Sequence, residues 1–80
     1  MSVVIYGKKN CIYCSKAIDL AVLEHLDFEY LNIDDAQNKA NLLEAFPNVK
    51  TVPQIWVDGF HVGGYHEFAA TIETKTETIT

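Results

Sequence analysis

The chain contains no arginine, only two cysteines and no long run of apolar residues. Its 11 acidic residues outweigh its 6 lysines and give a net charge of −5, which argues against nucleic acid as a partner. No apolar run approaches the roughly 20 residues that cross a bilayer. The apolar stretch at residues 3–6 is too short for a secretion signal. We therefore expect one cytoplasmic domain over residues 1–80, with no membrane partner.

The two cysteines, Cys11 and Cys14, form a C-x-x-C motif. Structural disulfides are rare in the cytoplasm, so a closely spaced pair there favours a catalytic or metal-binding role. Residues 2–6 predict a buried strand, because residues 3–6 form an unbroken apolar run. Residues 15–26 carry apolar side chains at helical spacing. A C-x-x-C motif at a strand-to-helix turn indicates a thiol–disulfide redox site.

The start of a helix is a favourable place for a thiolate. The first N–H groups of a helix lack intrahelical partners and carry the positive end of its dipole, so they stabilise the nucleophilic thiolate of Cys11. Cys14 lies one turn deeper on the same face, which suits a resolving thiol. Lys8, Lys9 and Lys16 surround the motif, and every acidic residue follows Lys16. This local positive charge favours a thiolate and an anionic ligand, although lysines in a loop are also ordinary solvated charges.

The rest of the chain predicts an alternation of strands and helices. In order, we expect a strand at residues 28–33, a helix at 36–46, strands at 54–57 and 60–62, and a last helix from Tyr65. Asp58-Gly59 between the two short strands is a strong hairpin signal. The threonine-rich end after Glu73 predicts fraying, because threonine is a poor helix former.

The element order β-α-β-α-β-β-α predicts an α/β fold, with a four-stranded mixed sheet and helices on both faces. The first three strands are joined through helices. We therefore expect them to be parallel with right-handed crossovers, and the hairpin to add an antiparallel edge.

Three motifs together make the chain resemble the glutaredoxin family, and the resemblance covers nearly the whole chain. The motifs are Cys11-Ile12-Tyr13-Cys14, Thr51-Val52-Pro53-Gln54 and Gly63-Gly64-Tyr65. The resemblance implies a thioredoxin fold and a dithiol enzyme that reduces protein disulfides and glutathione mixed disulfides. Glutathione would be its co-substrate, and no metal is expected. Ribonucleotide reductase is a candidate protein substrate that no residue selects, and we expect a monomer.

The resemblance also implies how the second and third motifs bind a substrate. Val52-Pro53 would be a cis peptide bond opposite Cys11, with the Val52 backbone pairing with an extended substrate. The bare sequence instead favours a trans proline at a strand start. Gly63 and Gly64 would let a ligand approach the backbone. The N–H groups that open the following helix would then hold the γ-glutamyl carboxylate of glutathione.

Side chains complete the implied site. Lys8 would bind the glycine carboxylate of glutathione, and Tyr13 would flank the tripeptide. The residues implied in glutathione and substrate binding are Lys8, Tyr13, Thr51, Val52, Pro53, Gly64, Tyr65, His66 and Glu67.

Three residues depart from the common family pattern. His66 stands where many members carry threonine and Glu67 where many carry aspartate. Ile12 stands where the common dithiol motif has proline, which fixes φ and lacks an N–H donor at the first helical position. We expect Ile12 to change the redox potential and leave the chemistry intact.

A zinc site is one alternative. Cys11 and Cys14 with His61 and His66 have acceptable local spacings for ligands. However, 46 residues separate the two pairs, where a compact zinc finger uses about a dozen.

Two further alternatives keep the redox motif. A redoxin reduced by thioredoxin reductase is the closer one, although no Gly-Pro separates the cysteines and Asn10 stands where thioredoxins usually have tryptophan. The other is a [2Fe–2S] cluster shared between two chains through Cys11 and glutathione. Ile12 and Tyr13 disfavour it, because relatives that carry clusters mostly have a small residue there.

Overall fold

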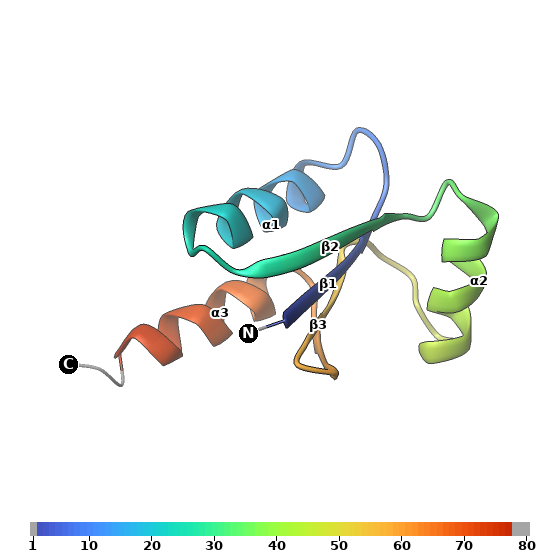
Figure 1. The fold of residues 1–80 in the computed structure, drawn as a ribbon. Coiled ribbons are helices and arrows are strands. Elements are labelled where there is room, and N and C mark those ends of the chain that lie inside the picture. Colours follow the sequence, from blue (N-terminus) through green and yellow to red (C-terminus); the bar gives the residue numbers. More distant parts are fainter. Residues whose placement is uncertain (1, 78–80) are drawn as a thin grey trace.

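The structure is a computed structural model that describes residues 2–77 (Figure 1). The elements are β1 (Ser2–Gly7), α1 (Ile12–Leu23), β2 (Asp27–Asn32), α2 (Ala36–Ala45), β3 (Gln54–Val57), β4 (Phe60–Gly63) and α3 (Tyr65–Glu77). This order is the predicted β-α-β-α-β-β-α. No helix within residues 2–77 is long and apolar enough to cross a membrane.

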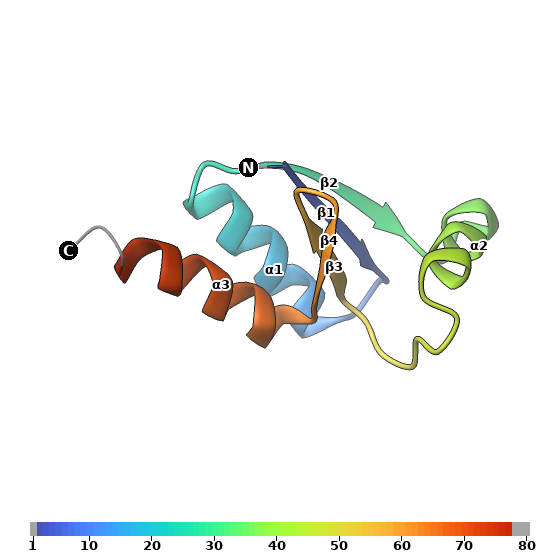
Figure 2. The same cartoon turned by 90° about the horizontal axis from the view of Figure 1, so that it is seen from below.

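The four strands form one mixed sheet in the order β2-β1-β3-β4. β1 is parallel to β2, β3 is antiparallel to β1, and β4 is antiparallel to β3. The prediction that the first three strands are all parallel is therefore wrong for β3. The reason is the position of α2, which lies beyond the end of β2 and does not run back along the sheet (Figures 1 and 2). The chain re-enters the sheet beside the carboxyl end of β1, so β3 runs antiparallel to β1.

The main core lies between the sheet and the helices α1 and α3, which lie side by side (Figure 2). In β1, alternate residues are buried, as expected for a strand with one face against the core. The buried core residues are Val3, Ile5, Ala17, Ala21, Ile55, Val57, Phe68 and Ile72. The alanines of α1 let that helix approach the sheet closely.

The opposite face of the sheet is covered less completely. Val4 and Tyr6 of β1 and Trp56 of β3 are only partly buried there. They share a shallow cavity of about 250 Å³ with Ala45, in the last turn of α2. α2 therefore reaches this face at its C-terminal end only, and a single residue of α2, Leu42, is buried.

Helix α1 ends earlier than its apolar pattern predicts. The pattern runs to residue 26, but the helix stops at Leu23, and both Val22 and Leu23 are exposed. His25 takes a left-handed φ of 56°. Its N–H donates to the Val22 carbonyl at 3.1 Å, and the Leu26 N–H donates to the Ala21 carbonyl at 2.9 Å. These two bonds form a Schellman motif, which ends the helix and turns Leu26 back toward the core.

The hairpin and the last helix agree with the sequence. Asp58 and Gly59 have φ values of 52° and 86°, the two positive values that a type I′ hairpin turn requires. α3 begins at Tyr65 as predicted. It continues past Glu73 to Glu77 without the fraying predicted there. The rest of that prediction concerns residues 78–80, which lie outside the described residues.

Candidate redox and substrate-binding site

The two cysteines stand at the N-terminal end of α1 and are joined as a disulfide. Cys11 is the N-cap residue, with an extended backbone, and its sulfur accepts a hydrogen bond from the Cys14 N–H at 3.2 Å. Cys14 is 1% exposed, whereas Cys11 is only partly buried. A substrate can therefore reach the sulfur of Cys11, while the sulfur of Cys14 faces the protein interior.

The position of Cys11 as the N-cap of α1 favours its thiolate in the reduced form. An N-cap side chain normally accepts one of the free N–H groups that open a helix. Here the acceptor is a sulfur, so the N–H of Cys14 and the helix dipole act directly on the atom that carries the thiolate charge. The helix start thus stabilises the nucleophilic state of Cys11 rather than that of Cys14.

The loop before β3 lies against Cys11. Val52-Pro53 is a cis peptide bond, which confirms that prediction. The Cys11 sulfur lies 3.8 Å from the Val52 carbonyl oxygen. Within residues 2–77 the Val52 N–H has no hydrogen-bond partner. An exposed backbone N–H and C=O beside a reactive sulfur can pair with an extended peptide.

A polar network that no sequence pattern predicted holds this loop to the hairpin. Gln54, only 6% exposed, donates through Nε2 to the Thr51 carbonyl at 2.9 Å and to Thr51 Oγ1 at 3.3 Å. Its Oε1 lies 2.8 Å from His61 Nε2. The His61 ring stacks on the Trp56 ring, with ring centroids 4.4 Å apart, and its centroid lies 4.8 Å from that of Phe46. The network therefore connects the hairpin to the residue before Val52.

Aromatic side chains gather on the other side of the cysteines. The Tyr13 ring lies 5.9 Å from that of Tyr65 and 5.2 Å from that of His66, between centroids. Lys16 places its ammonium group 5.3 Å from the Tyr13 centroid. Three of the predicted binding residues, from α1 and from the start of α3, thus lie together. His66 belongs to this group and His61 to the network of Gln54. No cluster of three or more His, Cys, Asp or Glu residues suited to a metal occurs in the part of the chain that is described.

The glycine pair lies beside the proline loop. A methyl group added at Gly64 would lie 3.5 Å from the Pro53 carbonyl oxygen, so the second and third motifs are neighbours. The Gly64 N–H donates to Glu67 Oε1 at 2.8 Å. This is the back-bonding half of a capping box. The Glu67 carboxylate therefore stabilises the start of α3, at the place where the sequence predicts an anion site.

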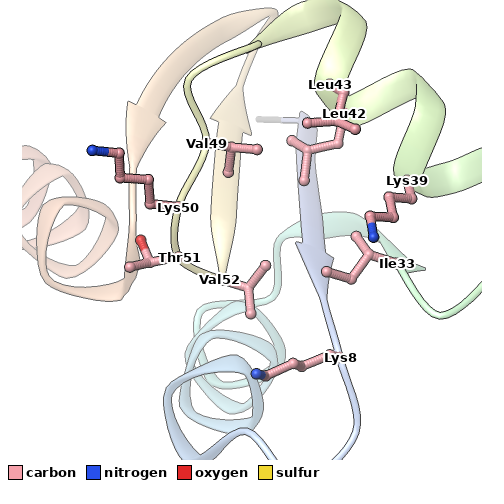
Figure 3. Close-up of a pocket in the computed structure, with 9 residues that line it drawn as sticks. All are labelled: Lys8, Ile33, Lys39, Leu42, Leu43, Val49, Lys50, Thr51 and Val52. Atoms are coloured by element: carbon pink, nitrogen blue, oxygen red, sulfur yellow. The ribbon is translucent and has the colours of Figure 1, made fainter.

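Lys8 and Thr51 line a cavity of about 240 Å³ that also includes Val52 (Figure 3). Binding roles for these three residues were predicted from the sequence, but the cavity itself was not. Its other walls come from Ile33, directly after β2, from α2 and from the loop after α2. Residues that line one cavity from such distant segments carry no common signal in the sequence.

Gly7 is a further residue of the site, and it was not among the residues predicted from the sequence. A methyl group there would lie 2.9 Å from the Cys14 sulfur and would overlap the Tyr30 ring. The Tyr30 hydroxyl donates to the Lys8 carbonyl at 3.3 Å. Burial, and secondarily the Asp34 carboxylate, raise the pKa of Tyr30 above its usual 10.0, so the phenol remains a donor at neutral pH. A glycine between a buried strand and the C-x-x-C loop was the available signal.

Comparison with known proteins agrees with this geometry. The family model for glutaredoxin matches residues 3–62. Glutaredoxin 1 of Escherichia coli is 41% identical over 89 residues, which cover 96% of this chain and 99% of that protein. The structure of reduced E. coli glutaredoxin superposes with a TM-score of 0.79 at 37% identity, covering 96% and 99% of the two chains. A buckwheat glutaredoxin–glutathione complex shares the fold, with a TM-score of 0.75 at 23% identity, covering 91% of this chain and 69% of that one.

This chain belongs to the glutaredoxin family. Its fold is the thioredoxin fold that the sequence predicts. With its Cys11–Cys14 disulfide at the start of α1, it is a thiol–disulfide oxidoreductase.

Proposed function

We propose that this protein uses glutathione to reduce protein disulfides and glutathione mixed disulfides, with Cys11 as nucleophile and Cys14 as resolving thiol. One observation carries the proposal: the sulfur of Cys11, a partly buried residue, accepts the Cys14 N–H and lies 3.8 Å from the carbonyl oxygen of Val52, whose own N–H has no hydrogen-bond partner within residues 2–77. This arrangement both activates a thiolate and orients a peptide-like disulfide toward it.

The reaction proceeds by thiol–disulfide exchange. The Cys11 thiolate attacks one sulfur of the substrate disulfide, the S–S bond breaks, and the departing thiolate takes a proton from water. The Cys14 thiolate then attacks the Cys11 sulfur, which releases the second substrate thiol and forms the Cys11–Cys14 disulfide. One glutathione thiolate reopens that disulfide as a mixed disulfide on Cys11, and a second one releases oxidised glutathione.

Glutathione fits the groups around Cys11. Its cysteinyl backbone pairs with the N–H and C=O of Val52, as an added strand would. Its γ-glutamyl carboxylate lies at the N-terminal end of α3, next to Tyr65 and His66, where the first N–H groups of the helix favour an anion. The Gly64 N–H is already bonded to Glu67 Oε1. Its γ-glutamyl ammonium group faces the Glu67 carboxylate, and its glycine carboxylate pairs with Lys8.

The remaining predicted residues form the walls of this site. Tyr13, Tyr65 and His66 cover the tripeptide on one side, and Thr51 and Pro53 support the pairing backbone of Val52 on the other. We further propose that the chain acts as a single domain and a monomer in the cytoplasm, where a glutathione pool keeps thiols reduced. Ribonucleotide reductase is one candidate protein substrate.

The test is a coupled assay on a small glutathione mixed disulfide, with glutathione and glutathione reductase supplying electrons. The same protein is assayed in parallel with thioredoxin reductase. Fast turnover with glutathione alone is the expected result. Turnover with thioredoxin reductase alone would overturn the glutathione site and leave the cysteine roles in place.

Cysteine variants separate the two thiols. We expect Cys14→Ser to keep deglutathionylation and to lose reduction of protein disulfides, because only the second reaction needs a resolving thiol. We expect Cys11→Ser to lose both activities. Loss of deglutathionylation in Cys14→Ser alone would contradict the assignment, and circular dichroism of each variant controls for folding.

A further inference from the structure

The cavity beside Val52 has an apolar floor that glutathione does not need. Ile33, Leu42, Leu43 and Val49 form this floor, between the end of β2, α2 and the loop that leads to Val52 (Figure 3). Leu42 is buried, whereas Leu43 is 41% exposed and accessible from the cavity side. Glutathione carries no large apolar side chain that would cover such a floor. About 240 Å³ is enough for one large aliphatic side chain of a bound peptide.

Positive charge surrounds this floor. Three lysines line the cavity, and no acidic residue does, although the protein as a whole has a net charge of −5. Within the described residues none of the three forms an ion pair. In Figure 3, the ammonium groups of Lys8 and Lys39 point into the space near Val52 and Ile33, whereas that of Lys50 points outward. The cavity thus combines an apolar surface with unneutralised cations.

The position of the cavity connects it to the redox centre. Val52 belongs to the cavity wall, and its carbonyl oxygen is 3.8 Å from the Cys11 sulfur. A peptide bound through its cysteine to Cys11 and paired with the Val52 backbone can reach the cavity within a few residues on one side of that cysteine, since an extended chain advances about 3.3 Å per residue. In the proposed binding mode glutathione ends at Lys8, whereas a longer chain has further residues that can lie over the floor.

We propose that this cavity, on α2 and the loop at residues 49–52, selects protein disulfide substrates that carry an acidic and a large aliphatic side chain close to the reactive cysteine. The aliphatic side chain lies on Leu43 and Val49, and the carboxylate faces Lys39. The inference rests on the proposed function and adds a specificity to it. A basic segment would meet uncompensated like charge at the same place.

The experiment uses three synthetic peptides, each with one internal disulfide. They differ only beside the cysteine that reacts: Asp and Leu, Lys and Leu, or Asp and Ala. Their kcat/KM values are measured at saturating glutathione. We expect the Asp–Leu peptide to exceed the Lys–Leu peptide about threefold, the size of an exposed charge pair. We expect it to exceed the Asp–Ala peptide by up to about tenfold, from burial of the leucine.

Charge reversal in the enzyme supplies the decisive comparison. Lys39→Glu should reverse the preference, so that the Lys–Leu peptide becomes the better substrate. Gln37→Glu, an exposed change on the same helix that does not line the cavity, should leave the preference as in the parent. Leu43→Ala should remove the advantage of Leu over Ala with little effect on folding, because Leu43 is already partly exposed.

A small cysteine–glutathione mixed disulfide, assayed with every variant, separates this inference from the function on which it rests. If the parent does not turn it over with glutathione, the proposed function fails and the inference fails with it. If the parent does so but turns over the three peptides equally, or if Lys39→Glu slows all substrates by the same factor, the inference alone is overturned. The supporting result is that Lys39→Glu turns over the small substrate at the rate of the parent protein and prefers the Lys–Leu peptide to the Asp–Leu peptide.

Discussion

At the scale of single residues, the space around the buried cysteine limits the site most strictly. Gly7 lies close to the Cys14 sulfur and to the Tyr30 ring, and a β-carbon at position 7 would lie 2.9 Å from that sulfur and overlap that ring. Strand β1 therefore must end in a residue without a side chain if α1 is to bring its second cysteine against the sheet. The exposed Cys11, by contrast, is controlled by backbone groups, namely the Cys14 N–H and the Val52 carbonyl.

We predict that Gly7→Ala destabilises the fold by about 1–3 kcal/mol, the usual cost of overpacking a buried position. It should also slow disulfide exchange, because the Cys14 sulfur must move. Urea denaturation and turnover of a peptide disulfide measure the two effects. Gly59→Ala is the comparison variant. Nothing lies within 4 Å of its added methyl group, so its cost in stability comes only from the backbone φ of 86° and not from overpacking. A Gly7→Ala protein as stable and as active as the parent would contradict this account.

At the scale of elements, the ends of α1 set its position as much as its apolar face does. Cys11 caps the first turn, and the Schellman motif at His25 closes the last one. A histidine in a left-handed conformation carries a steric cost that glycine avoids. The sequence signal at this end is weak because the usual glycine is missing.

We predict that His25→Gly raises the free energy of unfolding by about 1 kcal/mol. His25→Ala is the matched control, because it removes the imidazole but keeps the β-carbon and should give no gain. Thermal or urea denaturation of the three proteins measures the difference. Equal stability of the glycine and alanine variants would show that the left-handed conformation does not limit stability.

The hairpin formed by β3 and β4 acts on the site through Gln54. His61→Phe should preserve ring contacts with Trp56 and Phe46 but remove the bond to Gln54 Oε1. We predict a loss of about 1 kcal/mol in stability. We also predict a higher KM for the glutathione mixed disulfide at nearly unchanged kcat, since Thr51 precedes the pairing residue Val52. His61→Asn, which can still donate to Gln54, should have a KM between that of His61→Phe and that of the parent protein. A fall in kcat alone would argue against a positioning role.

At the scale of the whole molecule, two helices and two strands supply the buried core, and α2 stands apart from it. β1, β3, α1 and α3 all contribute to the buried cluster, whereas α2 buries only Leu42 (Figures 1 and 2). Local stability follows buried contacts, so elements outside the core open more readily. The same helix carries Lys39 and Leu43, and the proposed selectivity therefore depends on the least anchored helix.

We predict that α2 amides exchange with solvent at least about tenfold faster than those of β1, because a smaller opening free energy protects them. Hydrogen exchange followed by NMR measures this directly. A peptide bound through the Lys39 and Leu43 side chains should slow exchange in α2 and leave that in β1 unchanged. Equal protection of α2 and β1 in the free protein would contradict the prediction.

Local patterns in the sequence were sufficient for the element order, the hairpin turn and the redox motif. Apolar periodicity, the Asp58-Gly59 pair and the Cys-x-x-Cys spacing each depend on residues close in the chain. The cis bond before Pro53 came from the resemblance to a family, since its residues alone favour the trans form.

Only the tertiary structure decided the direction of β3, the contacts of Gly7, the bond between His61 and Gln54, and the cavity between α2 and Val52. Each depends on where a segment lies relative to residues far away in the sequence. The direction of β3 illustrates the reason. The chain contains a helix before this strand, as a parallel crossover requires, but α2 lies past the end of β2. β3 therefore begins at that same end of the sheet and runs antiparallel to β1. Residue patterns along the chain do not predict where α2 lies.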